Sequence, residues 1–222
     1  MPAFAAIFDW DGIVVDSAPL HVLTWDMLAK ERGRCLPEGL RIGSLGIKAE
    51  AVITDLLHWT QDPAEVRRLS FRKEELFRDI VRRDGIGAQP GVVRFLERLR
   101  KLGIPCAVGS SAPRLNIEVG MDALGIRPLF AASVAGDEAA RGKPAPDIFL
   151  QAAGRLGRKA SECVVFEDAP AGIEAAHAAG MQVIAVLTTN PREALAKADW
   201  IAGSFEEIID ADPASWFDAV RA

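Results

Sequence analysis

Residues 4–16 read FAAIFDWDGIVVD, an apolar run that ends in two acids and a glycine. The five uncharged residues 4–8 are typical of a strand that is buried on both faces of a sheet. Asp9 and Asp11 come directly after this run, so a strand here would deliver two carboxylates to the loop at its end. The stretch therefore predicts a buried parallel strand, and its carboxyl end is the place to look for chemistry.

Short apolar runs of the same kind recur along the chain and alternate with stretches of helical periodicity. The further strand candidates are residues 104–109, 130–135, 163–166 and 182–187. Between them, as over 92–102 and 148–156, apolar residues recur every three or four positions, which is the spacing of a helix with one buried face. This alternation predicts βαβ units and a mostly parallel sheet covered on both faces. The expected fold class is α/β, with a Rossmann-like parallel-sheet core.

Between residues 17 and 87 the periodicity is helical and no strand pattern intervenes. The apolar residues that mark three helices are Leu20, Leu23, Met27 and Leu28, then Val52, Ile53, Leu56 and Leu57, then Val66, Leu69, Leu76, Phe77 and Ile80. The charged residues of the third helix, including Glu74 and Arg78, are expected on a solvated face. We therefore predict an α/β catalytic core of 1–16 and 88–222, interrupted by an all-helical cap of 17–87.

Composition and charge exclude several classes of protein. Half of the 222 residues are apolar and 26% are charged, which is the balance of a globular chain. The net charge of −5 provides no basic field for nucleic acid. Cys35, Cys106 and Cys163 are far apart and lack the spacing of a zinc site or a redox dithiol. With neither a signal-peptide pattern nor an apolar run long enough for a bilayer, we expect a cytoplasmic monomer that binds no nucleic acid and no membrane.

Polar residues gather where the predicted strands end. They are Asp9 and Asp11 after the first strand, Ser110 after the second, Lys143 in the loop 141–146, and Glu167 and Asp168 after the fourth. Carboxylates at one sheet edge repel one another unless a cation neutralises them, and oxygen ligands suit Mg²⁺. A hydroxyl and an ammonium suit a phosphoryl group instead. Because these loops hold no histidine or cysteine, an aspartate is the candidate nucleophile.

These motifs resemble the four motifs of the haloacid dehalogenase superfamily, and they cover the chain in the same order. The resemblance is carried by residues 9–16 (DWDGIVVD), Ser110, residues 142–144 (GKP) and residues 167–168 (ED). It implies hydrolase chemistry on phosphate esters, with Mg²⁺ as the cofactor. The roles that it implies are Asp9 as nucleophile, Asp11 as general acid and then base, Ser110 and Lys143 as phosphate ligands, and Asp9, the main-chain carbonyl of Asp11, Glu167 and Asp168 as metal ligands.

Each of these residues also has a purely structural interpretation. An Asp-Gly pair is common in tight turns, and Ser110 could cap a helix that starts near Pro113. Lys143 could be a solvated surface lysine. Either Glu167 or Asp168 could cap the helix expected from Pro170 onward.

The start of the predicted cap resembles the β-phosphoglucomutase subgroup, which has a histidine and a tryptophan at the places of His21 and Trp25. The resemblance implies that His21 faces the nucleophile, whereas an exposed polar residue is the alternative. Trp25 is expected in the cap core, packed beneath His21 because the two residues are four positions apart.

A departure from that subgroup occurs after the glycine loop 43–46. The mutase pattern has an arginine there that holds a distal phosphate, but this chain has Lys48 followed by Ala49. Lys48 is thus a candidate substrate residue, or else a solvated lysine at a helix start. The departure favours a phosphatase over a mutase.

We therefore expect a magnesium-dependent phosphatase that hydrolyses a small phosphorylated metabolite, such as a sugar phosphate, through an aspartyl-phosphate. A cap of about 70 residues that closes over the site favours small substrates over proteins. The alternative is a hexose phosphate mutase of the β-phosphoglucomutase type. Dehalogenase and phosphonatase chemistry are disfavoured because Asp11 supplies the acid that ester cleavage needs, and a noncatalytic binding protein would lack one of these residues.

Overall fold

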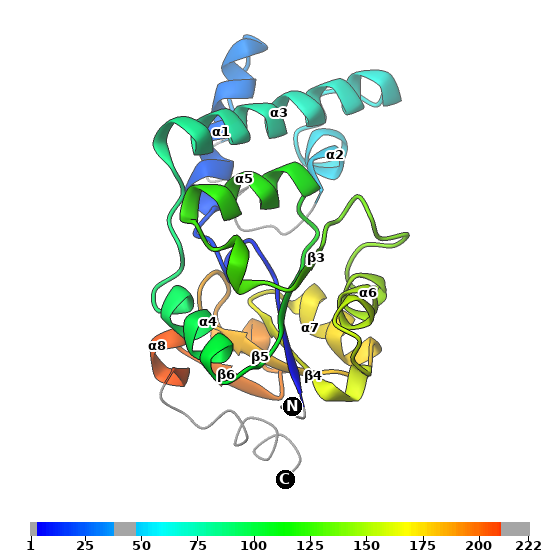
Figure 1. Cartoon of the computed structure of the whole chain (residues 1–222). Helices are drawn as coiled ribbons and strands as arrows, with labels where there is room; N and C mark the ends of the chain where they lie inside the picture. Colours follow the sequence, from blue (N-terminus) through cyan, green and yellow to red (C-terminus); the bar gives the residue numbers. More distant parts are fainter. Residues whose placement is uncertain (1–3, 38–47, 210–222) are drawn as a thin grey trace.

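The computed structural model describes residues 4–37 and 48–209 (Figure 1). The glycine loop 43–46 lies outside the described residues. Every helix in the described part of the chain is too short or too polar to cross a bilayer.

The core is a sheet of six parallel strands in the order β3-β2-β1-β4-β5-β6. The strands are β1 (Ala5–Phe8), β2 (Cys106–Gly109), β3 (Ala132–Val134), β4 (Cys163–Glu167), β5 (Gln182–Val186) and β6 (Trp200–Ala202). The register places Phe8 beside both Val108 and Phe166, so the residues that follow β1, β2 and β4 meet at one edge. The strand order reverses between β1 and β4, where ligands bind in open sheets of this type. The expected α/β fold class is confirmed.

Helices cover both faces of the sheet. They are α4 (Val92–Lys101), α5 (Arg114–Leu124), α6 (Asp147–Arg155), α7 (Pro170–Ala178) and α8 (Phe205–Ile208). Ala6 and Phe8 of β1 belong to the apolar cluster formed with α4, α5 and α8, while Ala5 and Ile7 belong to the cluster with α6 and α7. This alternation is that of a strand buried on both sides, and it explains the uncharged run in the sequence.

All described elements between β1 and α4 are helical. They are α1 (Ala18–Glu31), α2 (Ala49–Ala51), the π-helical turn η2 (Val52–Leu56) and α3 (Pro63–Asp84). Figure 1 shows them as a layer beyond the carboxyl ends of the strands, with α3 lying over α5. They form an apolar cluster of their own around Trp25, Leu28 and Ile53. The domain boundaries at 16/17 and 87/88 stay a prediction.

The strands differ from the predicted ones mainly at their ends. β2 begins at Cys106 rather than at residue 104, because Pro105 has no N–H for the ladder and offers only its carbonyl, which accepts from Ala6 N. The edge strand β6 was not predicted at all. It stands between Asp199 and Gly203, so the sequence there has no uncharged run as long as the one that contains β3.

Candidate active site

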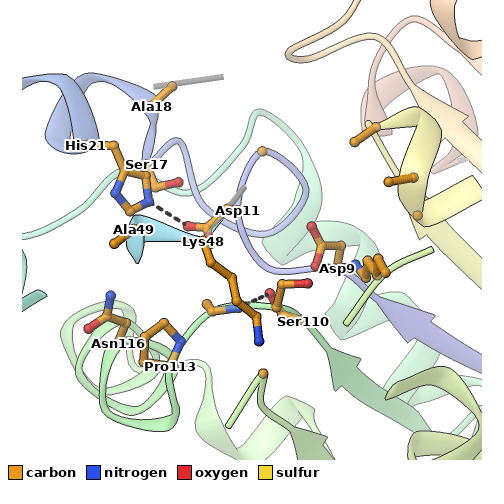
Figure 2. A pocket seen from close by; sticks show the side chains of 18 of the residues that line it. Asp9, Asp11, Ser17, Ala18, His21, Lys48, Ala49, Ser110, Pro113 and Asn116 are labelled. Carbon is orange, nitrogen blue, oxygen red and sulfur yellow. Dashed lines mark hydrogen bonds and ion pairs between the residues drawn. The ribbon is translucent and has the colours of Figure 1, made fainter. Parts of the chain in front are cut away.

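A cavity with a volume of about 280 Å³ lies beyond the carboxyl ends of the central strands (Figure 2). The loops that follow the strands form one wall, called here the core wall, and side chains of α1, α2 and α3 form the opposite cap wall. Figure 2 shows Asp9 and Ser110 close together, with Asp11 between them and His21. The two acids that follow β1 thus face different parts of the cavity.

Lys143 joins two buried carboxylates on the core wall. Its Nζ lies 2.8 Å from Asp9 Oδ1 and 2.6 Å from Glu167 Oε1. Burial lowers the pKa of Lys143, but the two carboxylates outweigh burial and raise that pKa above its usual value. The ammonium therefore stays charged beside Asp9. The ring of Phe149, whose centroid is 4.7 Å from Nζ, covers another side of the ammonium.

Asp9, Glu167 and Asp168 form a buried acidic cluster in which one oxygen of each residue lies within 4.8 Å of the others. Burial, assisted by the charge of Glu167 and opposed by Lys143, raises the pKa of Asp9 to about 6. Burial and the charges of Glu167 and Asp9 raise the pKa of Asp168 to about 8. Lys143 alone is thus too little positive charge for three carboxylates. The all-oxygen donor set fits a hard divalent cation such as Mg²⁺.

Backbone groups and a glycine fix the carboxylate of Glu167. Its Oε2 accepts hydrogen bonds from the N–H groups of Asp168 and Ala169, 2.8 and 2.9 Å away. A Cβ on Gly172 would lie 1.7 Å from Glu167 Oε1, so only glycine leaves room for this carboxylate. Glu167 therefore both satisfies backbone donors before α7 and faces the acidic cluster.

Residues after β5 hold Asp168. Thr188 Oγ1 donates to Asp168 Oδ2 at 3.2 Å, and Asn190 Nδ2 donates to the Asp168 carbonyl at 2.8 Å. Gly12, with φ = +79°, also lies close to this carboxylate, because a Cβ there would be 2.0 Å from Asp168 Oδ2. These contacts restrict the Asp168 carboxylate to a single position.

Ser110 is buried at the end of β2, and its hydroxyl reaches the cavity. Its Oγ accepts a hydrogen bond from Ala112 N at 3.1 Å, a bond drawn in Figure 2. Helix α5 starts at Arg114 and has Pro113, without a side-chain bond, at its N-cap. Ser110 therefore fixes the turn before α5 and does not cap the helix.

Asp11 faces the cap wall. His21 Nε2 lies 3.5 Å from Asp11 Oδ1, and His21 Nδ1 lies 2.7 Å from Lys73 Nζ. Because an ammonium only donates, Nδ1 must accept, which places the proton of a neutral imidazole on Nε2, toward Asp11. Burial raises the pKa of Asp11, but hydrogen bonds from His21 and Ser17 outweigh it, so that pKa lies below its usual value.

Lys73 is a buried cation on the cap wall. It pairs with Glu74 at 2.9 Å and lies over the ring of Phe77, on which His21 also stacks. Glu74 in turn accepts a hydrogen bond from Asn116 of α5. The cap wall is therefore a connected set of charged and polar groups.

The family model of haloacid dehalogenase-like hydrolases matches residues 5–180 of the chain. The chain belongs to this hydrolase family. It is 34% identical to the 5-amino-6-(5-phospho-D-ribitylamino)uracil phosphatase of Arabidopsis thaliana chloroplasts, over 91% of this chain but 55% of that longer protein. It is also 34% identical to hexitol phosphatase A of Escherichia coli, over 91% of both chains. A family IA hydrolase from Entamoeba histolytica has the same fold, with a TM-score of 0.87 and 26% identity over 99% of this chain and all of that one.

The hydrolase brings the predicted residues of the core together at one edge of its sheet. They are Asp9, Asp11, Ser110, Lys143, Glu167 and Asp168, all of which line the cavity. The sequence analysis did not name Thr188 and Asn190 as site residues. Both follow the last predicted strand, so they too were expected at the edge of the sheet where ligands bind.

The cap of this hydrolase agrees with expectation at Trp25 and differs from it on α3. Trp25 is buried in the cap cluster, as expected, and His21 lies at the site, stacked on Phe77 with ring centroids 4.7 Å apart. Glu74 and Arg78 do not lie on a solvated face, because α3 packs against α5 there and both side chains bond to Asn116. Lys73 was missed. Lys73 lies four residues after Leu69 and four residues before Phe77, which puts it on the apolar face of the helix. This spacing could have predicted that Lys73 is buried.

Lys48 extends from the start of α2 across the cavity (Figure 2). Its Cε lies 3.7 Å from the place that a Cβ on Gly142 would occupy, so the side chain reaches the loop that carries Lys143. Among the described residues it has no ion-pair partner. Ala49, which follows it, offers no side-chain donor to the cavity.

Proposed function

We propose that this hydrolase is a magnesium-dependent phosphatase of small polyol or sugar phosphates, acting through an aspartyl-phosphate on Asp9. The observation that carries the proposal is the separation of two acids. Asp9 contacts Lys143 in the acidic cluster, while Asp11, two residues later, contacts His21 of the cap wall. This separation supports attack on phosphorus by one carboxylate and proton transfer by the other.

The reaction has two displacements. Asp11 is a carboxylate in the free site because its pKa is low, so it first takes a proton that the phosphate ester brings as its monoanion. An oxygen of Asp9 then attacks phosphorus, the bond from phosphorus to the ester oxygen breaks, and the leaving oxygen takes the proton from Asp11. A water molecule then attacks the phosphorus of the aspartyl-phosphate and gives a proton to Asp11. The bond from Asp9 to phosphorus breaks, which releases inorganic phosphate and restores both carboxyl groups.

Other residues of the core wall bind the phosphoryl group and the cation. The Lys143 ammonium and the Ser110 hydroxyl offer donors to phosphoryl oxygens, whose charge grows in the transition state. Asp9, Glu167, Asp168 and the main-chain carbonyl of Asp11 would hold Mg²⁺. When bound, the cation neutralises the acidic cluster and polarises the phosphoryl group.

The substrate class is supported by the cavity and by the relatives. A volume of about 280 Å³ is at the small end of ligand sites, which span about 300–1,000 Å³. The names of two relatives contain a phosphorylated ribityl chain and a hexitol, both open-chain polyols. The cap wall offers polar groups to such hydroxyls, among them Glu50, Ser70 and Lys73.

A mutase is less well supported. A mutase must hold a second phosphate while it excludes water from the aspartyl-phosphate, and the mutase pattern uses an arginine for this. Ala49 cannot bind a phosphate through its side chain, and Lys48 offers a point charge rather than a planar fork of donors. Water should therefore intercept the intermediate.

The test is a substrate panel with phosphate release as the readout. Hexitol, pentitol and sugar monophosphates are incubated with enzyme and Mg²⁺, with excess chelator, and with the Asp9→Asn variant. We expect phosphate release that needs both Mg²⁺ and Asp9. Full activity in chelator, or conversion of β-glucose 1-phosphate to the 6-phosphate many times faster than phosphate release, would overturn the proposal.

A further inference from the structure

The side-chain amide of one core residue, Asn116, forms hydrogen bonds to the cap through both its nitrogen and its oxygen. Asn116, in the first turn of α5, is 2% exposed. Its Nδ2 donates to Glu74 Oε2 at 2.6 Å, and its Oδ1 accepts from Arg78 Nη1 at 3.1 Å. Glu74 and Arg78 lie one helical turn apart on α3, so the two helices meet at this amide.

The amide is one end of a hydrogen-bonded chain that returns to the site. Glu74 uses its other oxygen, Oε1, to accept from Lys73 at 2.9 Å. Lys73 contacts His21, and His21 faces Asp11. The chain thus leaves the core at α5, crosses the cap through α3 and α1, and ends at the acid that follows β1.

These contacts are well suited to a closure that must reverse. Apolar contacts are not directional, so they allow two helices to shift relative to each other. An amide that donates to a carboxylate and accepts from a guanidinium holds the two helices in one relative position, because hydrogen bonds are directional. Water can replace each of the bonds when the helices part. Cap movement over a site commonly gates substrate entry and product release.

We propose that Asn116, Glu74 and Arg78 form a latch that holds the cap closed over the core in one position. Through Glu74 the latch orients Lys73, and Lys73 fixes the His21 tautomer that faces Asp11. Asn116 lines the cavity, but it acts on Asp11 through Glu74, Lys73 and His21, so it is a positioning residue. The inference rests on the proposed function in taking Asp11 as the general acid.

The test reverses the direction of one hydrogen bond. Asn116→Asp places a carboxylate against Glu74, and we expect kcat/KM for a polyol phosphate to fall about tenfold or more, since one charge-assisted bond is lost and two like charges meet. Adding Glu74→Gln supplies an amide that donates to the new carboxylate and keeps a carbonyl for Lys73. The total charge is then that of the wild type, and we expect the double variant to recover most of the lost activity.

Scattering gives a readout that does not depend on activity. The radius of gyration of Asn116→Asp, measured by small-angle X-ray scattering, should exceed that of the wild type and return toward it in the double variant. Asp79→Asn is the matched control, because it removes a carboxylate from the exposed ion pair with Arg82 on the same helix. We expect this control to match the wild type in both measurements.

A neutral variant covers the case in which Asn116→Asp does not fold. Asn116→Ser shortens the side chain so that it no longer spans Glu74 and Arg78, and Glu74→Gln should then add little further loss, because the coupling between the two positions is gone. Wild-type activity of the folded variants, or a double variant as impaired as Asn116→Asp, would overturn the latch. If the wild type releases no phosphate from the panel, the proposed function is wrong, and the scattering comparison alone decides on the latch.

Discussion

The core wall of the cavity is made of loops that follow parallel strands, whereas the cap wall is made of side chains that project from helices. On the core wall, Asp9, Ser110 and Glu167 are buried and have backbone neighbours fixed by the sheet register. On the cap wall, Lys73 and Glu74 depend on how α3 packs against α1 and α5. From this difference we expect a division of work, in which the core wall holds the reacting group and the cap wall admits, orients and encloses the substrate.

The largest expected effect is on the core wall. Asp9→Asn should reduce hydrolysis of an aryl phosphate by about 10⁴-fold or more, as the loss of a catalytic nucleophile does. The fold should persist, because the amide removes one charge from an acidic cluster that is already crowded. Aryl phosphate assays with circular dichroism check both statements. Near wild-type turnover would mean that the nucleophile is another residue.

Asp11 should show a loss that depends on the leaving group. Asp11→Asn should slow hydrolysis of polyol phosphates by about 10²–10⁴-fold, because their alkoxides need a proton to leave. Esters of acidic phenols should lose much less, since those groups leave unaided. The comparison is of kcat/KM for a hexitol phosphate and a nitrophenyl phosphate. Equal losses on both substrates would argue against the role of general acid.

The acidic cluster should make the stability of the metal-free protein depend on pH. The pKa values of about 6 for Asp9 and about 8 for Asp168 lie above the usual 3.8, so folding favours their protonated forms. This contribution to stability is complete below about pH 4 and is lost as pH rises toward 8. Mg²⁺ should therefore raise the Tm by a few degrees more at pH 8 than at pH 5.

Thermal unfolding with and without Mg²⁺ at the two pH values measures this difference. Asp168→Asn serves as the control, because it removes the carboxyl group with the higher pKa and should shrink the gap. An equal gain in Tm at pH 5 and pH 8 would mean that the cation binds elsewhere.

The smallest effect is expected for the exposed cation of the cap wall. Lys48→Ala should change KM for a polyol monophosphate by less than about threefold and leave kcat unchanged, because exposed charges contribute little. Steady-state kinetics decide the matter. A fall in kcat of a hundredfold would place Lys48 on the reacting group and would blur the distinction between the two walls.

The sequence predicted the two walls unequally, for a physical reason. Asp9, Ser110, Glu167 and Asp168 could be predicted because a parallel sheet brings all strand ends to one edge, whatever the details of packing. The cap wall could not be predicted in the same way. The partner of an α3 side chain depends on the neighbouring helix, which the local periodicity does not identify.

Asn116 shows the limit most clearly. An asparagine in the first turn of a helix has nothing in its sequence neighbourhood to indicate that both ends of its amide meet α3. Only the packing of α3 against α5 shows this. The same holds for the stacking of Phe77 of α3 on His21 of α1, because the two residues are far apart in the sequence.

The central claim is that the phosphoryl group is transferred first to Asp9 and then to water. The stereochemistry at phosphorus tests this claim most directly. The substrate is a hexitol thiophosphate whose phosphorus is made chiral by sulfur and two oxygen isotopes. It is hydrolysed in water that carries the third oxygen isotope, and the configuration at phosphorus in the released thiophosphate is then measured. Each in-line displacement inverts the phosphorus centre, so two displacements predict overall retention. Overall inversion would show that water attacks the ester directly and would contradict an aspartyl-phosphate on Asp9.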